Sequence, residues 1–269
     1  MNSADLQPLL RDAARIELLP RFGRIAAAAK ADGSLVTEAD VAVQRHIQQR
    51  LKDAYPDIGF LGEEMRGEDH ARLLRELAEG RHDGLWVLDP LDGTINFASG
   101  VPCFAVSLAL LDRDGVRAGL ILDPLRDECF RADRGAGAFL NDMPLRAGTD
   151  AGVLKECVAE IDLKRLTERL RLALVRAQPF RSQRNFGSGA LDWAWLAAGR
   201  FQLYLHGGQK LWDYAAGSLI LAEAGGHAVT LQHEPVYTGV IAPRSVVGAG
   251  DEALFKAWRD WLRAADPID

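Results

Sequence analysis

The chain contains an apolar run that ends in two closely spaced aspartates, and this pattern restricts the fold more than any other. Leu85–Leu88 predicts a buried strand, because such a run needs cover on both faces. Asp89 and Asp92 follow it three residues apart, with Pro90 fixing the backbone between them and Gly93–Thr94 directly after. Carboxylates are ligands of hard cations, and free backbone N–H groups at a helix start bind phosphate. The sequence therefore predicts a strand end where a divalent cation and a phosphate lie side by side.

Composition and charge limit the class of protein. The 269 residues suffice for one large α/β domain or two smaller ones, and 48% hydrophobic with 26% charged residues is typical of a soluble globular protein. A net charge of −6 argues against a general nucleic-acid binder, but it allows a small phosphorylated substrate beside a bound metal ion. Cys103, Cys129 and Cys157 form no disulfide or zinc pattern. Without a signal peptide or an apolar run of about 20 residues, we expect a cytoplasmic protein that does not enter a membrane.

The two halves of the chain predict different arrangements of elements. In the first half, two amphipathic helices precede an antiparallel meander of short strands, with a hairpin turn at Asp112–Gly115. The second half alternates, with strands expected at 153–161 and 201–205 and helices at 163–174, 190–197, 212–224 and 251–265. Alternation of this kind is typical of an α/β lobe. We expect a layered α/β (α+β sandwich) fold with two lobes, residues 1–146 and 147–269.

Acidic residues gather where regular elements begin or end. They are Asp40, Glu63, Glu64, Asp89, Asp92 and Asp213. Each has an ordinary structural interpretation: Asp40 completes a capping box, and Asp213 is a first-turn acid favoured by the helix dipole. Mg²⁺, however, prefers such oxygen ligands, and the Leu91 carbonyl is placed to turn toward the same ion as its neighbours. The combination of several such positions in one chain favours a metal site.

These positions fall in motifs that resemble the signatures of one enzyme family. Asp89–Phe97 resembles the first signature of the inositol monophosphatase family, and Trp212–Gly217 with Glu223–Gly226 resembles its second. Leu35–Asp40 and Phe60–Glu64 match its two upstream motifs in order and spacing. The similarity covers essentially the whole chain. It implies a sugar-phosphatase fold, Mg²⁺-dependent and lithium-sensitive hydrolysis of a phosphate monoester, and a homodimer.

The resemblance also implies a role for individual residues. The ligands of a first metal ion are Glu63, Asp89 and the Leu91 carbonyl, and those of a second are Asp89, Asp92 and Asp213. Glu63 also helps to hold a third, weaker ion, so two or three Mg²⁺ ions are expected per site. Asp40 and Thr94, with Glu63, form the catalytic set around a metal-activated water that attacks phosphorus directly.

The substrate contacts implied by the resemblance are Asp92, Gly93, Thr94, Ser188, His206 and Asp213. His206 departs from the family pattern, because members that prefer inositol phosphates carry an acidic residue at this position, seven residues before the aspartate of the second signature. A neutral imidazole accepts one hydrogen bond where a carboxylate accepts two or more. A specificity for inositol therefore does not follow from the resemblance.

Three hypotheses of function remain open at this point. The first is a phosphomonoesterase for a small phosphorylated polyol or sugar. The second uses the same metal site on 3′-phosphoadenosine 5′-phosphate, fructose 1,6-bisphosphate or histidinol phosphate. The third is a regulatory binding protein that retains the metal site, and phosphate release across these substrates separates it from the other two.

Overall fold

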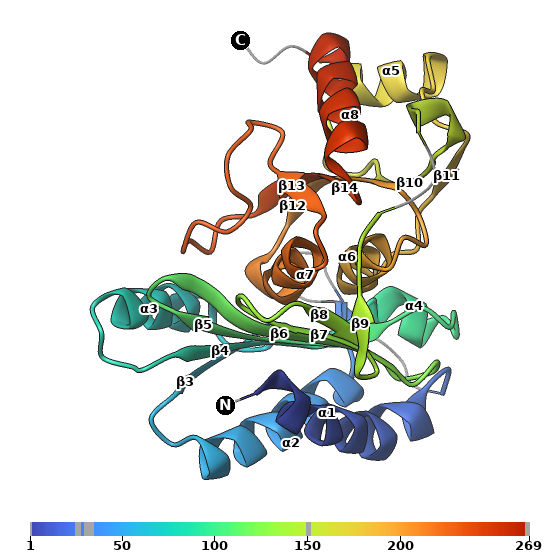
Figure 1. Ribbon diagram of the computed structural model, residues 1–269. Coiled ribbons are helices and arrows are strands. Elements are labelled where there is room, and N and C mark those ends of the chain that lie inside the picture. The colour runs from blue at the N-terminus through green and yellow to red at the C-terminus, as the bar shows by residue number, and fades with distance from the viewer. Residues whose placement is uncertain (1, 25–27, 30–34, 149–151, 267–269) are drawn as a thin grey trace.

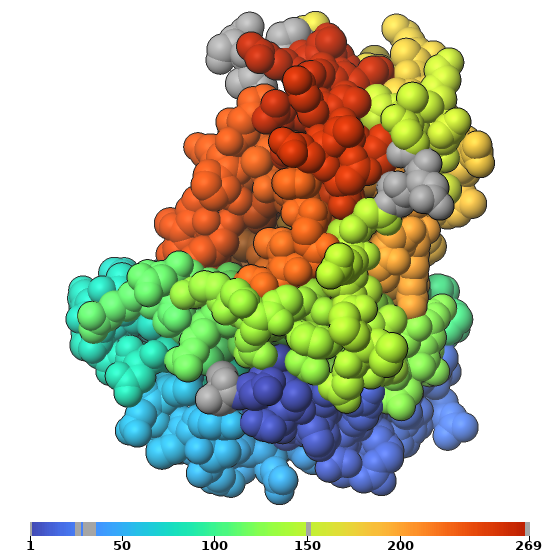
Figure 2. Space-filling view, viewed as in Figure 1, coloured from blue at the N-terminus to red at the C-terminus, as the bar shows by residue number. Residues whose placement is uncertain are grey.

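The computed structural model stacks helices and sheets in alternating layers, in the order helix, sheet, helix, sheet, helix (Figure 1). It describes residues 2–24, 28–29, 35–148 and 152–266. From the N-terminal to the C-terminal side, the helix layers are α1 (Gln7–Ala13) with α2 (Glu38–Ala54), α6 (Gly189–Ala197) with α7 (Leu211–Glu223), and α5 (Glu168–Arg176) with α8 (Glu252–Ala265). The space-filling view places the N-terminal residues (blue) at one end of the molecule and the last helix (red) at the other (Figure 2). The predicted layered α/β fold is therefore confirmed.

The first sheet has seven strands, and each pairs with the next along the chain. They are β3 (Gly59–Gly62), β4 (Leu85–Asp92), β5 (Ala105–Asp112), β6 (Gly115–Asp123), β7 (Glu128–Asp133), β8 (Ala138–Leu140) and β9 (Met143–Leu145). The β3–β4 pair is parallel and the pairs that follow are antiparallel, so β4 to β9 form the predicted antiparallel meander. β3 is an edge strand, and α3 (Gly67–Ala78) packs beside it.

The second sheet has five strands in the order β11-β10-β12-β14-β13. They are β10 (Val158–Asp162), β11 (Ser182–Arg184), β12 (Leu203–Gln209), β13 (His227–Val229) and β14 (Arg244–Ala249). The predicted strand 153–161 is wrong in its first part, because Leu154–Glu156 forms a 3₁₀ turn. The helix predicted from residue 163 begins at Glu168, where the Thr167 hydroxyl caps the Leu170 N–H at 3.1 Å.

Short elements complete the chain. A 3₁₀ turn at Ser3–Leu6 precedes α1, and a π-helical turn at Ala14–Leu18 with a 3₁₀ turn at Leu19–Arg21 follows it. β1 (Ala28–Ala29) and β2 (Leu35–Val36) form an antiparallel pair, and α4 (Thr94–Ala98) follows β4 directly. Within the described ranges, no helix combines the length and the apolar character needed to cross a membrane.

Close packing of α7 joins the two halves. A Cβ atom on Gly217 of α7 would lie 2.2 Å from Trp193 Cβ of α6, and one on Gly119 of β6 would lie 2.8 Å from the Ala216 backbone. These glycines therefore allow α7 to approach both the neighbouring helix and the first sheet. One continuous apolar cluster contains side chains from both halves, among them Val87 and Trp193. The boundary at residues 146/147 remains a prediction.

Candidate active site

A β-bulge in β4 brings the two aspartates of the first motif to the same side of the sheet. Asp89 pairs with Ser107 and Asp92 with Ala105, so β4 has one residue more than β5 between these positions. In a regular strand, residues three apart point to opposite faces, and an extra residue restores the same face. Pro90 suits the bulge because it has no N–H to donate to the ladder. The Leu91 N–H turns back to Asp89 Oδ1 at 3.0 Å.

The second motif reaches the same place through the start of α7. Asp213 lies in the first turn of α7, and its Oδ2 accepts the Lys210 N–H at 2.8 Å. Ser107 is the strand partner of Asp89 on β5, and its hydroxyl donates to the Trp212 carbonyl at 3.1 Å. Ser107 therefore fixes the start of α7 against the strand that carries Asp89. Sequence reasoning missed this serine, because nothing in its local pattern marks it.

Asp92 is held by the start of α6. Its Oδ2 accepts the Ser188 hydroxyl at 2.5 Å and the Ala190 N–H at 2.8 Å. These bonds and the helix dipole favour the ionised carboxylate. Ser188 is buried and turned toward Asp92, and its predicted contact with substrate stays a prediction.

Three carboxylates meet where these segments converge. Oxygen atoms of Asp89, Asp92 and Asp213 all lie within 4.8 Å of one another. Burial and the mutual repulsion of these groups with Glu63 raise the pKa values of Asp89 and Asp213 well above the usual range. Burial raises the pKa of Asp92 to about 6, although its hydrogen bonds with Ser188 and Ala190 act in the opposite direction. A close group of carboxylates in which Asp89 is buried and Asp92 and Asp213 are half-buried is a fitting ligand set for a divalent cation, which would remove the repulsion.

Glu63 stands beside this cluster at the end of β3. Its N–H donates to the Leu88 carbonyl at 3.0 Å and extends the β3–β4 ladder toward Asp89. Its charge contributes to the raised pKa values of Asp40, Asp89, Asp92 and Asp213, so it lies within their electrostatic reach. The N–H of the neighbouring Glu64 donates to Gln44 Oε1 at 3.1 Å.

Asp40 and Thr94 come together although they are 54 residues apart. The predicted capping box is confirmed, because Asp40 Oδ2 accepts the Thr37 N–H at 2.7 Å and its hydroxyl at 2.6 Å. The other oxygen of Asp40, Oδ1, lies 3.2 Å from the Thr94 hydroxyl. The Thr94 hydroxyl also lies 3.0 Å from the Leu91 carbonyl oxygen. Burial raises the pKa of Asp40.

Gly93 sets the direction in which Thr94 leaves β4. Its φ of 88° is left-handed, and a Cβ atom there would lie 2.9 Å from the Cys103 carbonyl. Asn96, further along α4, donates to the Cys103 carbonyl at 2.8 Å and to the Phe186 carbonyl at 2.7 Å. The bond to Phe186 ties α4 to the segment that leads into α6, and the bond to Cys103 ties it to the segment that leads into β5.

His206 offers a hydrogen-bond donor instead of the expected acceptor. Its Nδ1 accepts the Gly208 N–H at 3.0 Å, so in the neutral ring the proton lies on Nε2. Burial lowers its pKa to about 4, which keeps the ring neutral near pH 7. Asp162, its register partner on β10, places Oδ2 3.7 Å from Nε2. A carboxylate is therefore present beside this position, but it comes from the neighbouring strand.

Further buried acids near the cluster were missed from the sequence. Glu160 on β10 and Asp192 on α6 are buried, and each contains carboxylate oxygen that has no hydrogen-bond partner in the described part of the chain. Burial raises the pKa of Glu160 to about 8, and burial followed by repulsion from Glu160 and Asp92 raises that of Asp192. The available signal was Val158–Asp162, a buried strand in which acids alternate with apolar residues.

The layered fold and the acidic cluster define an α/β protein with a site suited to a divalent cation. The model of the inositol monophosphatase family matches residues 9–261. An inositol-1-monophosphatase from Rhizobium meliloti is 34% identical over 88% of this chain and 86% of its own length. A Nus factor SuhB from Xylella fastidiosa is 36% identical over 77% of this chain and 71% of its own length. The solved structure of the extragenic suppressor protein suhB from Bartonella henselae covers 98% of this chain and 100% of its own, with 29% identity and a TM-score of 0.83.

The chain belongs to the inositol monophosphatase family. The resemblance found in the sequence is therefore confirmed, and the family match and the inositol-1-monophosphatase relative support a phosphatase. The family and the acidic cluster together support binding of a divalent metal ion.

Proposed function

We propose that this protein is a Mg²⁺-dependent phosphomonoesterase for a small phosphorylated polyol or sugar. The observation that carries the proposal is the meeting of Asp89, Asp92 and Asp213 within 4.8 Å, with Glu63 in electrostatic reach. Such a ligand set is oxygen-only, as Mg²⁺ prefers. Glu63, Asp89 and the Leu91 carbonyl would hold one ion, and Asp89, Asp92 and Asp213 another.

The bound ions would lower the pKa of the attacking water and neutralise charge on the phosphoryl and leaving oxygens. The protein's own contribution begins with Asp40 and Thr94. Thr37 occupies Asp40 Oδ2, so Oδ1 is free to receive a proton from the Thr94 hydroxyl. Thr94 in turn accepts the proton of the water as it attacks phosphorus. Because burial raises the pKa of Asp40, its carboxylate is a stronger base than an exposed aspartate.

The phosphate would lie over the turn between β4 and α4. There the N–H groups of Gly93 and Thr94 donate to no acceptor among the described residues. Free N–H groups in such a turn bind phosphoryl oxygens. The left-handed φ of Gly93 gives the turn its shape.

The leaving group would be recognised by Asp162 together with His206. The carboxylate of Asp162 accepts hydroxyl protons, and the His206 Nε2–H donates to a hydroxyl or ring oxygen. This pair fits a polyol or sugar, which offers both kinds of group. Inositol-specific members of the family would have a single carboxylate on β12 at the position of His206. We therefore propose that the preferred substrate of this protein is a phosphorylated polyol or sugar other than inositol phosphate.

A binding role through a partner protein is the alternative, because several relatives are named Nus factor SuhB. We favour catalysis because Asp40 and Thr94, which metal binding alone does not require, are aligned at 3.2 Å. We further propose that the protein is a cytoplasmic homodimer, that two or three Mg²⁺ ions bind per site, and that Li⁺ inhibits it.

The test is phosphate release with Mg²⁺ or with EDTA across inositol phosphates, sugar phosphates, 3′-phosphoadenosine 5′-phosphate, fructose 1,6-bisphosphate and histidinol phosphate. We expect turnover with Mg²⁺, highest for a sugar or polyol phosphate, and its loss in Asp213→Asn. Asp114→Asn, the same change at an exposed turn, is the matched control. No turnover of any substrate by the folded, Mg²⁺-loaded protein would favour the binding role.

A further inference from the structure

A cavity lies at the open edge of β3, between α2 and α3. It has a volume of about 350 Å³, and none of the proposed catalytic residues lines it. Its walls include the apolar side chains Leu51, Ile58, Phe60 and Leu73. This volume is within the range of small-molecule sites, roughly 300–1,000 Å³. We call it the β3-edge groove.

The backbone of β3 presents an unused donor to this groove. The N–H groups of Gly59 and Glu63 donate to the carbonyls of Gly84 and Leu88 on the β4 side. In this parallel ladder the backbone N–H groups point alternately toward β4 and away from it, so those of Phe60 and Gly62 point away from β4. Gly62 finds partners in the Met65 sulfur at 3.2 Å and in His70 Nε2 at 2.9 Å. The Phe60 N–H has no acceptor in the ranges that the structure describes.

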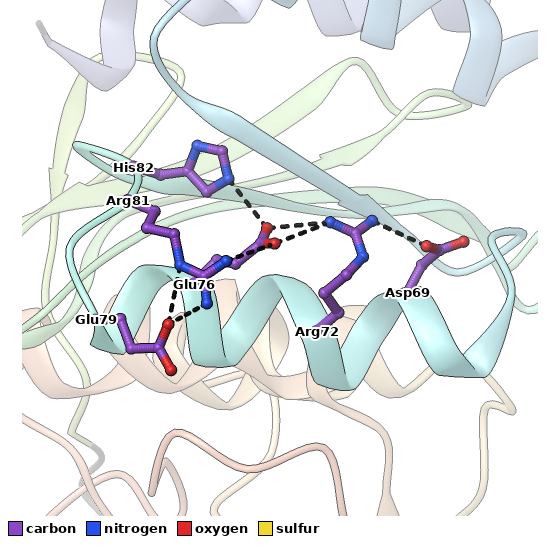
Figure 3. A network of polar contacts seen from close by, with 6 residues as sticks. All are labelled: Asp69, Arg72, Glu76, Glu79, Arg81 and His82. Atoms are coloured by element: carbon purple, nitrogen blue, oxygen red, sulfur yellow. Dashed lines mark hydrogen bonds and ion pairs between the residues drawn. The ribbon is translucent and has the colours of Figure 1, made fainter.

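The rim of the groove has spare donors but no spare acceptor among its charged groups. Glu76 is its acidic group, and it already accepts from Arg72 at 3.0 Å, Arg81 at 3.3 Å and His82 at 3.4 Å (Figure 3). Lys52, at the C-terminal end of α2, forms no ion pair with any residue of the described chain. A ligand therefore meets a cation and a backbone N–H beside apolar walls.

We propose that the β3-edge groove binds a small amphipathic carboxylate. Its apolar ring or chain lies against Phe60 and Leu73, and its carboxylate pairs with Lys52 and the Phe60 N–H. Charge complementarity identifies the occupant, because a neutral molecule leaves Lys52 unpaired and a cation is repelled. The groove also contains Met65, and β3 ends beside Glu63, so an occupant fixes the segment that carries a proposed metal ligand. This inference goes beyond the proposed function and does not depend on it.

Binding of indole-3-acetate, a bicyclic apolar body with one carboxylate, tests the proposal. Calorimetry on the full chain should give a Kd below about 5 mM. The neutral indole-3-acetamide should bind at least about 10-fold more weakly, because its amide does not pair with Lys52. Hydrogen exchange followed by NMR gives a second readout, and indole-3-acetate should slow exchange at the Phe60 amide about 10-fold while the Leu61 amide, already in the ladder, changes little.

Lys52→Glu should weaken indole-3-acetate binding at least about 10-fold by reversing the charge at the rim. Arg45→Glu, the same change at an exposed position of α2 outside the groove, should leave binding unchanged. Equal binding to both variants, equal binding of acid and amide, or no binding at about 5 mM overturns the proposal. Protection of the Phe60 amide that rises with protein concentration in the absence of indole-3-acetate also overturns it, because a second copy of the chain then covers the β3 edge.

Discussion

Asp92→Asn tests the carboxylate cluster through stability as well as activity. The pKa of Asp92 rises from 3.8 to about 6 in the folded protein, first because of burial. A raised folded pKa means that the folded state retains its proton while the unfolded state loses it. The stabilising contribution is therefore complete below pH 3.8 and is lost as the pH rises through 6. A shift of about 2 pKa units changes the free energy of unfolding by about 3 kcal/mol over the whole titration. About 2 kcal/mol of this change occurs between about pH 4 and pH 8.

The amide that replaces the carboxylate carries no charge at any of these pH values, so the variant does not lose stability from ionisation of residue 92 as the pH rises. In EDTA, the free energy of unfolding of Asp92→Asn relative to wild type should rise by about 2 kcal/mol from about pH 4 to pH 8, as measured by urea denaturation. Mg²⁺ at about 100 times its Kd should stabilise the wild type by about 2.7 kcal/mol and the variant by less. Phosphate release should fall at least about 100-fold.

The control for this experiment is Asp114→Asn, which removes a carboxylate from an exposed turn. Its relative stability should show no comparable dependence on pH or Mg²⁺. The reasoning is refuted if Asp92→Asn shows the same difference from wild type at both pH values and gains as much from Mg²⁺ as the wild type. Near-normal phosphate release by Asp92→Asn would refute the catalytic assignment separately.

Three further changes test other parts of the site and fold. Thr94→Ala should lower kcat about 100-fold with little change in KM, because proton transfer to Asp40 is lost, whereas Thr94→Ser should retain most activity. His206→Glu should raise kcat/KM for inositol monophosphate relative to a sugar phosphate, and an unchanged ratio would remove His206 from leaving-group recognition. Gly217→Ala should lower the free energy of unfolding by about 1–3 kcal/mol in urea denaturation, because its Cβ meets Trp193 at 2.2 Å; no loss would show that α6 and α7 separate at little cost.

Local patterns predicted the elements that carry the site. The apolar run before Asp89 indicated β4, because a strand buried on both faces needs continuous apolar residues. Thr37 and Asp40 indicated the start of α2, because a capping box uses only contacts between near neighbours. The strand predicted at 153–161 is confirmed from Val158 onward, but its first part is wrong, because Leu154–Glu156 forms a 3₁₀ turn that local periodicity did not indicate.

The contacts that orient the site were beyond reach from the sequence. Ser188 binds Asp92 across 96 residues, and Ser107 fixes the start of α7 across 105. Both are single hydroxyls in ordinary surroundings, so only the fold shows their partners. The same holds for His206: its Nδ1 is occupied by Gly208, and the carboxylate beside it belongs to Asp162 through the register of two parallel strands.

The arrangement of layers explains why the carboxylates come from distant segments. β4 belongs to the first sheet, and α7 lies between the two sheets, so Asp89 and Asp213 approach each other only where a helix start meets a strand end. At that junction the bulge in β4 adds Asp92, and the start of α6 supplies the bonds that hold it. Repulsion among these closely spaced carboxylates opposes the close approach of the two halves, and a bound divalent cation replaces this repulsion with attraction. Metal binding and the docking of the halves are therefore coupled, so cations that stabilise the fold should be those that support turnover.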